Sequence, residues 1–328
     1  MMKKILVIQT ASIGDVILAT PVLEKLHTYF PEADIDILVK KGNEGLFTAH
    51  PFIHEVLVWN KQKRSLMNFD QLMHKVWYAK YELVVNLQRF FLTGLMTAFS
   101  GAAIKTGFNK NPLSFLFTKK IPHLIQSNTH EIERNLSLID SFTGPGLVKP
   151  RLYPADLDFE KVIQYKHSSY YTLSPASLWY TKQYPAGKWA ELIREMPSGH
   201  PVYLLGSPAD HPLCEQIILE SGSNIAVNLS GKLTFLESSA LMKDARMNFT
   251  NDSAPLHLAS AVNAPVTVVY CSTIPGFGFG PLSDDSAIVE IQEELKCRPC
   301  GLHGLSKCPR GHFHCAVKIP ESLLLKRC

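Results

Sequence analysis

Strand-length apolar segments recur along this chain, and segments with the spacing of amphipathic helices separate them. The first, Lys4–Ile8, is a short β-branched run typical of a buried strand in a parallel sheet. Seven further segments share this character: residues 35–39, 55–59, 83–87, 170–173, 202–205, 247–250 and 266–270. Because strands that alternate with helices form parallel βαβ units, we expect an α/β protein.

Gly and Pro residues interrupt the alternation near the middle, at Gly144–Pro150 and at Tyr153-Pro154. A chain of 328 residues is long enough for two domains. We therefore expect two α/β domains, one over residues 1–155 and one over residues 156–328.

The loop after the first strand carries small and polar side chains. Residues 9–15 read Gln-Thr-Ala-Ser-Ile-Gly-Asp and lead into an apolar helical segment, residues 16–26. Ligands of open α/β sheets bind beyond the carboxyl ends of the strands, so Ser12, Gly14 and Asp15 are predicted at a substrate site. A single glycine is not the dinucleotide fingerprint, which needs three glycines at fixed spacing.

A second loop with anion-binding character follows the strand at residues 247–250. Asn251, Asp252 and Ser253 offer a helix N-cap, and proline is tolerated in the first turn that follows. The free amides and the dipole of such a helix suit a phosphate, to which His257 would add a donor. Taken alone, the pattern fits an ordinary capped helix with a satisfied histidine.

A third loop, residues 173–185, places hydroxyls at Ser177 and Thr181 beside the cation of Lys182. This combination suits a diphosphate, because an ammonium neutralises the charge that builds on a leaving group. By itself Lys182 would be interpreted as a solvated surface lysine. A further strand ends in a glycine turn at Gly206, so several strand-end loops together indicate a phosphate site.

In their order along the chain, these motifs resemble those of glycosyltransferase family 9, the heptosyltransferases of lipopolysaccharide core assembly. The motifs that carry the resemblance are Ser12–Asp15, Thr20-Pro21, His130–Arg134, Lys182, Tyr184-Pro185, Asn251–Ala259 and Gly280-Pro281. The resemblance implies a GT-B architecture, with two Rossmann-like domains facing across a cleft. It further implies that the first domain binds the acceptor and the second binds the nucleotide sugar.

The resemblance also implies the chemistry. Members of the family are inverting, need no metal or cofactor for transfer, and use ADP-heptose as donor and a lipid A core carrying Kdo as acceptor. Asp15 matches the general base and Lys182 the lysine on the leaving phosphates, while Asp252, Ser253, Ala254 and His257 match the nucleotide-diphosphate loop, with Ser177 beside it.

Two alternatives remain for Asp15, namely orienting the acceptor hydroxyl and capping its helix. The chain also departs from the family pattern, since Ser253 and Ala254 stand where threonine and glycine are common. The hydroxyl and the small side chain are kept, so phosphate binding should survive.

The acceptor side is predicted from charge. Besides Ser12 and Gly14, we expect acceptor contacts from basic residues after a strand end and in the His130–Arg134 segment: Lys61, Lys63, Arg64 and Arg134. Lys105, Lys110, Lys119 and Lys120 alternate with Phe108, Phe115 and Phe117. Such a pattern suits an acidic sugar, a phosphorylated lipid at a membrane surface, or simply a solvated basic face.

Composition limits the location and the partners. The chain begins without the features of a signal peptide, and its most apolar later stretch, Phe90–Phe99, is shorter than the roughly 20 residues that span a bilayer. We expect a cytoplasmic protein that lies at most peripherally on the inner face of the cytoplasmic membrane. A net charge of +4 without a nucleic-acid-binding motif argues against a nucleic-acid partner.

Four cysteines gather near the end of the sequence: Cys297, Cys300, Cys308 and Cys315. With His303, His312 and His314 they offer enough soft ligands for a tetrahedral zinc, although the spacing matches no known finger. In a reducing cytosol the alternatives are a structural zinc or a reduced thiol cluster, and neither would be catalytic.

Two other classes of function remain to be compared with glycosyl transfer. A nucleotide-sugar epimerase or dehydrogenase needs a nicotinamide fingerprint, which the first strand lacks. A noncatalytic sugar-nucleotide-binding protein would not need Asp15 or a basic acceptor side. Together with the resemblance, which implies inversion, these points lead us to expect an inverting glycosyltransferase.

Overall fold

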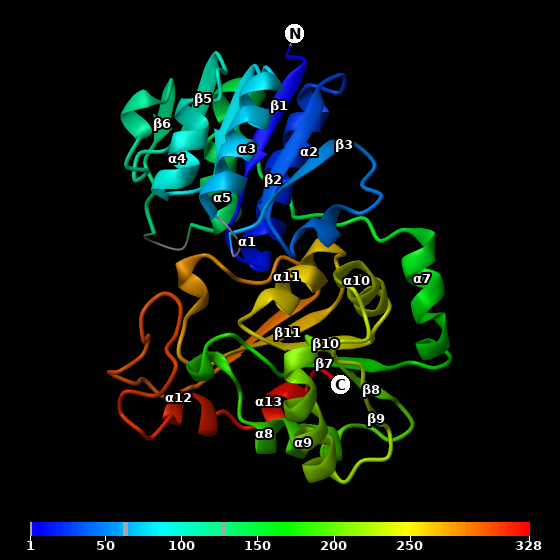
Figure 1. The fold of residues 1–328 in the computed structure, drawn as a ribbon. Coiled ribbons are helices and arrows are strands. Elements are labelled where there is room, and N and C mark those ends of the chain that lie inside the picture. Colours follow the sequence, from blue (N-terminus) through cyan, green and yellow to red (C-terminus); the bar gives the residue numbers. More distant parts are fainter. Residues whose placement is uncertain (1, 62–64, 126–128) are drawn as a thin grey trace. The chain divides into compact units, whose positions relative to one another are not determined.

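The computed structural model describes residues 2–61, 65–125 and 129–328. The chain divides into two compact units, Met1–Tyr153 (the first unit) and Pro154–Cys328 (the second unit). Each unit contains a six-stranded sheet in which every neighbouring pair of strands is parallel (Figure 1).

The sheet of the first unit has the order β3-β2-β1-β4-β5-β6. Its strands are β1 (Lys4–Ile8), β2 (Asp34–Lys40), β3 (Ile53–Trp59), β4 (Leu83–Asn86), β5 (Ile104–Phe108) and β6 (Lys119–Ile121). Its helices are α1 (Ile13–Ile17), α2 (Thr20–Tyr29), η1 (Glu44–Phe47), α3 (Ser65–Tyr78), α4 (Phe91–Ala98), η2 (Ser114–Leu116), α5 (Glu131–Ser137) and α6 (Asp140–Thr143). Because the strand order reverses between β1 and β4, the ligand crevice of this sheet is expected at their carboxyl ends.

The sheet of the second unit has the order β12-β11-β10-β7-β8-β9. Its strands are β7 (Tyr171–Ser174), β8 (Val202–Leu204), β9 (Ala226–Asn228), β10 (Met247–Asn251), β11 (Val266–Tyr270) and β12 (Ser286–Glu290). Its helices are α7 (Asp156–Val162), η3 (Ile163–Tyr165), η4 (Tyr180–Lys182), α8 (Ala186–Glu195), η5 (Pro208–Asp210), α9 (His211–Ser221), α10 (Phe235–Lys243), α11 (Ala254–Ala261), η6 (Pro275–Phe277), α12 (His314–Val317) and α13 (Ser322–Leu325). Here the order reverses between β7 and β10, which places the corresponding crevice beside these two strands.

The central strands are buried on both faces. Ile5, Leu6, Val7 and Ile8 in β1 are all fully buried, and so is every residue of β11. Since successive side chains of a strand point to opposite faces, both faces of each sheet are covered by other elements. This burial explains why these strands read as continuous apolar runs in the sequence.

The expected α/β class with parallel sheets is confirmed, and so are the predicted strands. The prediction omitted β5, β6, β9 and β12, which lie in the outer parts of the two sheets. The Gly144–Pro150 segment lies within the first unit, where the Lys25 ammonium donates a hydrogen bond to the Gly146 carbonyl over 3.1 Å.

The aromatic residues expected on a basic surface behave differently from one another. Phe108 and Phe117 are buried in the first unit, so their predicted place on an exposed acceptor surface is wrong, whereas Phe115 is exposed. Phe108 ends β5, and its ring packs edge-on against the ring of His123. In the described residues, no helix combines the length and the apolar character needed to cross a bilayer.

Candidate functional site

The loop after β1 is held in place by side chains from several neighbouring segments. The Lys61 ammonium donates hydrogen bonds to the Thr10 carbonyl (3.0 Å) and hydroxyl (3.1 Å), and it lies over the ring of Trp59. The Asn43 amide donates to the Ala11 carbonyl over 3.1 Å. Lys61 thus lies beside the loop that carries Ser12, and its hydrogen bonds are with that loop.

Across the strand-order reversal, the loops after β1 and β4 are joined directly. The side-chain amide of Gln88 donates to the side-chain oxygen of Gln9, and both residues are buried. Sequence reasoning named neither glutamine. Their connection stiffens the crevice where the predicted substrate residues begin.

Asp15 is the third residue of α1, and its carboxylate accepts hydrogen bonds from the backbone N–H of Ser12 (3.1 Å) and from the Ser12 hydroxyl. This is a helix-capping arrangement. The second unit contains the same arrangement, in which the Asp210 carboxylate accepts from the N–H and the hydroxyl of Ser207, each over 2.7 Å. Capping therefore occurs at both positions and does not distinguish Asp15.

Its electrostatic surroundings do distinguish Asp15. Glu131, at the start of α5, is buried and paired with Arg134, whose Nε donates over 2.8 Å and whose Nη2 lies 2.7 Å from the same carboxylate oxygen. Burial raises the pKa of Glu131, the Arg134 guanidinium lowers it, and the charge of Asp15 raises it. Asp15, Glu131 and Arg134 thus form one interacting charge cluster.

Glu131 is a functional candidate that the sequence patterns did not indicate. The sequence does contain a signal for the ion pair, because Glu131 stands three residues before Arg134 in the His130–Arg134 motif, a spacing that brings two side chains together on a helix. The Asn135 amide, on the same helix, donates to the Leu18 carbonyl over 3.1 Å and so ties α5 to the segment after α1. Of the other predicted acceptor residues, Gly14 lies in α1, while Lys63 and Arg64 lie outside the described residues.

In the second unit, the loops after β7 and β10 interlock at the strand-order reversal. The Asn251 side chain accepts from the Tyr184 N–H (2.9 Å) and donates to the Pro175 carbonyl (2.6 Å). The Ser253 hydroxyl donates to the Ala176 carbonyl over 3.3 Å. These bonds bring together two loops for which the sequence separately predicted phosphate binding, the loop after β7 and the loop after β10.

Lys182 and Asp252 form the central ion pair of this region, with 2.7 Å between the ammonium and one carboxylate oxygen. Their side chains are 15% and 8% exposed, so the pair is largely removed from solvent. The Thr273 hydroxyl donates to the same Asp252 oxygen over 2.5 Å. Because a carboxylate cannot donate to a phosphate, the role this geometry gives Asp252 is to hold Lys182 in place.

The predicted helix after β10 is confirmed. Helix α11 begins at Ala254, with Ser253 as its N-cap and Pro255 in its first turn. His257 follows within the same turn and is buried. The start of α11, the Ser253 hydroxyl and Lys182 therefore lie together where the strand order reverses, and the free amides of α11 suit an anion there.

Ser177 lies further along the loop after β7. It is half-buried, and its backbone carbonyl accepts a hydrogen bond from the Gln183 side chain over 2.7 Å. This bond links Ser177 to the residue that follows Lys182.

A segment from the end of the chain completes the surroundings of Lys182. The Leu305 N–H donates to the Thr181 hydroxyl (2.8 Å), and the Thr181 N–H donates to the Leu305 carbonyl (3.1 Å). Gly304 has a φ of +77°, and a Cβ built on it would lie 2.9 Å from Lys182 Cγ. No local sequence signal links Gly304 to Lys182, so the prediction missed this contact.

Two Rossmann-like units, each with polar residues gathered where its strand order reverses, make up a GT-B architecture. The family model for glycosyltransferase family 9 (heptosyltransferase) matches residues 70–303, and the chain belongs to this family. It is therefore a glycosyltransferase of the heptosyltransferase type.

Known proteins resemble the chain over most of its length. Lipopolysaccharide heptosyltransferase 3 from Escherichia coli is 28% identical over 279 residues, which cover 79% of this chain and 81% of that protein. The structure of E. coli ADP-heptose lps heptosyltransferase II matches with a TM-score of 0.80 at 21% identity and covers 99% of this chain and 97% of its own. E. coli heptosyltransferase WaaC with ADP-2-deoxy-2-fluoro heptose matches with a TM-score of 0.70 at 18% identity, covering 87% and 92%.

Proposed function

We propose that this enzyme transfers a heptose from ADP-heptose to a lipopolysaccharide core acceptor that carries an acidic sugar. The observation that carries the proposal is the Lys182–Asp252 pair at the strand-order reversal of the second unit, next to the start of α11. The names of the similar proteins supply the sugar, the nucleotide and the acceptor class. In this proposal the second unit binds the donor and the first unit binds the acceptor.

On the donor side, the ammonium of Lys182 and the first amides of α11 bind the diphosphate. Ser253 supplies a hydroxyl and His257 an imidazole, and the small side chain of Ala254 lets the backbone approach the phosphates. Ser177 lines the same loop. Positive charge already in place at the leaving group stabilises the transition state without a reorganisation cost.

Transfer proceeds with inversion. The acceptor hydroxyl oxygen attacks the anomeric carbon on the face opposite the diphosphate, the bond from that carbon to the diphosphate oxygen breaks, and the hydroxyl proton passes to the Asp15 carboxylate. The departing ADP carries the negative charge, which Lys182 and the amides of α11 offset. Because these groups supply the positive charge, the chemistry needs no metal ion.

On the acceptor side, Arg134 forms an ion pair with Glu131, whose carboxylate the charge of Asp15 reaches, and we assign Arg134 to the acceptor side as part of this charge cluster. Ser12 and Gly14 line the loop, and Lys61 offers a cation to an anionic acceptor. Lys63 and Arg64 extend this basic group in the proposal.

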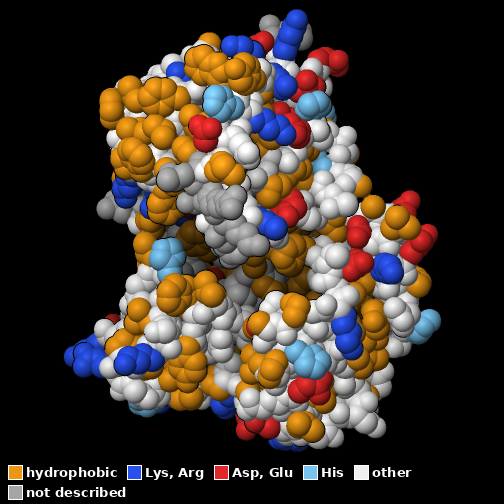
Figure 2. All heavy atoms as spheres, viewed as in Figure 1, with side chains coloured by type: hydrophobic (Ala, Val, Ile, Leu, Met, Phe, Trp, Pro, Cys, Tyr) orange, Lys and Arg blue, Asp and Glu red, His pale blue; other side chains and the backbone are white. Residues whose placement is uncertain are grey.

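An acceptor built on a lipid brings the enzyme to the cytoplasmic surface of a membrane. Large apolar side chains are exposed on the first unit: Phe90, Phe91, Leu92, Phe99, Phe115 and Leu116. Figure 2 shows hydrophobic side chains gathered over the region of α4, β5 and β6. Exposed aromatic groups of this kind suit peripheral contact with the bilayer interface.

The test combines ligand binding with product analysis. Thermal shift with ADP, UDP and NAD should show stabilisation by ADP and none by NAD. Incubation with ADP-heptose and a Kdo-bearing lipid A acceptor, without added Mg²⁺ or Mn²⁺, should give a glycosylated product whose anomeric configuration is opposite to that of the donor by NMR. Stabilisation by NAD, or a product of retained configuration, would refute the proposed chemistry.

A further inference from the structure

We propose that Cys297, Cys300, Cys308 and Cys315 bind one Zn²⁺ ion through four thiolates, and that this centre holds the segment that positions Lys182. The metal would be structural and take no part in transfer.

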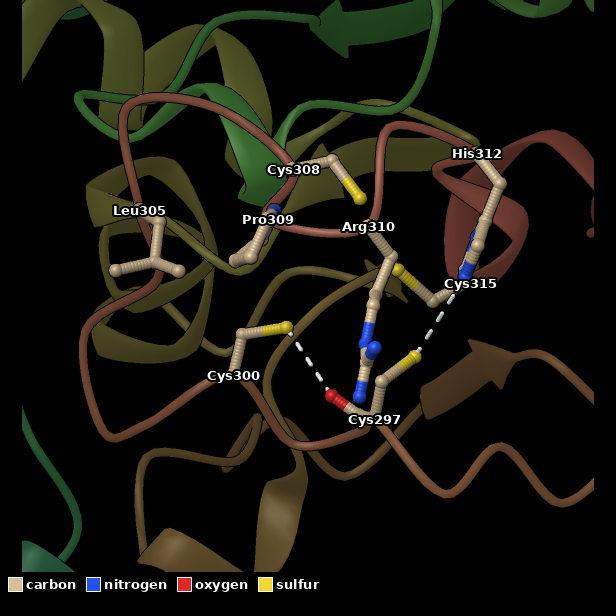
Figure 3. Close-up of a pocket in the computed structure, with 8 residues that line it drawn as sticks. All are labelled: Cys297, Cys300, Leu305, Cys308, Pro309, Arg310, His312 and Cys315. Atoms are coloured by element: carbon tan, nitrogen blue, oxygen red, sulfur yellow. Dashed lines mark hydrogen bonds between the residues drawn. The ribbon is translucent and has the colours of Figure 1, made fainter.

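The four thiols share one cavity. A cavity of about 220 Å³ is lined by all four cysteines, together with Leu305, Pro309, Arg310 and His312 (Figure 3). The Cys300 thiol lies 3.2 Å from the Cys297 carbonyl oxygen, to which it donates. A site for a thiophilic cation is therefore assembled from four cysteines of one segment, residues 297–315.

Binding requires the sulfurs to converge. Within the described residues, no three His, Cys, Asp or Glu side chains already have their donor atoms in positions to hold a metal. All four thiols are free of disulfides, and one side-chain torsion moves each sulfur. On binding, the four thiols release four protons and form four Zn–S bonds of about 2.3 Å in a tetrahedron.

His312 faces the sulfur of Cys297, one of the proposed metal ligands. Its Nδ1 accepts a hydrogen bond from the His314 N–H over 3.0 Å, which assigns the proton of the neutral ring to Nε2. That Nε2 lies 3.9 Å from the Cys297 sulfur, so it faces the sulfur as a donor. Hydrogen bonds to ligand sulfurs orient the ligands of metal centres.

A nearby cation offsets part of the charge. Four thiolates around Zn²⁺ leave two net negative charges, and Arg310 lines the cavity. Arg298 follows Cys297 directly, but its guanidinium is already paired with Glu290 over 2.6 Å. Arg310 therefore supplies positive charge beside an anionic centre, and Arg298 anchors the chain next to Cys297 through the carbonyls of Cys271 (2.8 Å) and Thr273 (2.7 Å).

The segment that carries the first three of the four cysteines has no secondary structure to hold it in place. Residues 291–313, between β12 and α12, contain neither helix nor strand. Loops of this length inside a compact unit are uncommon without a functional or structural reason. A metal centre supplies the ordering that secondary structure does not.

The same segment contacts the candidate donor site. Gly304 and Leu305 lie between Cys300 and Cys308, and they contact Lys182 and Thr181 as described above. The Cys300 N–H also donates to the Ser272 carbonyl over 2.9 Å, and the Ser272 hydroxyl donates to Thr181 over 2.9 Å. Fixing Cys300 and Cys308 therefore fixes both ends of the loop that packs on Lys182.

The first experiment measures metal in the full-length protein, purified without chelators, by inductively coupled plasma mass spectrometry. We expect about one zinc per chain in the wild type and in Cys328→Ser, which removes a cysteine outside the cavity, and loss of the zinc in Cys300→Ser and Cys308→Ser. A wild type without metal, or zinc retained in both cavity variants, would overturn the site. An equivalent content of iron would overturn zinc as its occupant.

A second measurement avoids the folding of the variants. Metal-free wild type reconstituted with Co²⁺ should show the charge-transfer absorption of a tetrahedral thiolate complex, and absorption without these bands would contradict four-sulfur binding. The positioning role rests on the proposed function and has its own readout, namely weaker ADP binding after metal removal and recovery with added Zn²⁺. If the wild type itself does not bind ADP, the proposed function fails while the metal content still decides the site. Unchanged ADP affinity in folded, metal-free protein would overturn the positioning role.

Discussion

The Lys182 ammonium lies 2.7 Å from the Asp252 carboxylate, in a pair that is mostly buried and shared with the Thr273 hydroxyl. Asp252 follows β10 and Lys182 ends η4. The pair therefore joins the two strand-end loops on either side of the strand-order reversal. It holds the Lys182 side chain in place, so little conformational entropy is lost when a diphosphate binds there.

Replacing Lys182 with methionine should weaken ADP binding by roughly 10- to 100-fold, because it removes a charge-assisted contact of roughly 1.5–3 kcal/mol. It should also lower the melting temperature, since it leaves the buried Asp252 carboxylate without its counter-charge. The control is Lys188→Met, which breaks ion pairs with Glu191 and Glu321 in the same unit. Calorimetric titration with ADP checks both variants, and equal ADP affinity in the two would exclude Lys182 from the site.

Asp15→Asn should lower transfer by roughly 10²–10⁴-fold if Asp15 is the general base, because an amide cannot take the proton. Asp210→Asn is the matched control, because each carboxylate accepts a hydrogen bond from the backbone N–H of a serine three residues earlier, at the start of its helix. Each substitution should cost up to about 1 kcal/mol of stability through the cap alone. Turnover and melting temperature are measured together. Near-normal transfer in Asp15→Asn, with a loss of stability like that of Asp210→Asn, would leave capping as the role of Asp15.

Gly304→Ala should raise the donor KM, because the new methyl group would lie 2.9 Å from Lys182 Cγ and displace the lysine. Gly301→Ala separates this effect from backbone strain. Gly301 has a similar φ, +81°, but no atom lies within 4 Å of the position of its Cβ. Both variants should lose about 1–2 kcal/mol of stability from the left-handed backbone. A donor KM that changes equally in both would show that the contact with Lys182 is unimportant.

Stability should fall as the pH is lowered from about 6.5 toward 4, partly because of His123. Burial, helped by the charges of Arg89, Arg134 and Lys110, lowers the pKa of His123 from 6.5 to about 4 in the folded protein. Between these pH values the unfolded chain binds a proton at His123 that the folded protein does not, so acid favours unfolding. Above pH 6.5 neither state binds that proton, and His123 no longer lowers the free energy of unfolding.

The variant His123→Phe should reduce the slope of the free energy of unfolding against pH by the equivalent of about one bound proton. Urea unfolding at several pH values between 4 and 7 measures this slope. His50→Phe should act similarly, because burial also lowers the pKa of His50 to about 4. If the slope of stability against pH is the same in wild type and His123→Phe, His123 is not neutral in the folded protein.

Local sequence patterns were sufficient for the central strands and for the helix at Ala254. Apart from Lys4 in β1 and Thr267 in β11, the residues of these strands are apolar because both faces of the strand are covered, and this pattern is visible without a structure. The short outer strands β5, β6, β9 and β12 carry more polar residues, and their formation depends on pairing with a neighbour. Their hydrogen-bond partners lie far away in the sequence, so local patterns did not predict them.

The sequence by itself determined the parallel α/β class and the loops that carry Asp15, Lys182 and Asp252, because each depends on residues within one strand–loop–helix unit. The candidate chemistry came from the order of the motifs along the chain, which resembles that of glycosyltransferase family 9. Only the tertiary structure decided that Asp252 pairs with Lys182, that Glu131 and Arg134 share a charge cluster with Asp15, and that Gly304 packs on Lys182. Each of these relationships joins separate segments of the chain. Their geometry follows from strand order and side-chain packing, which no local periodicity encodes.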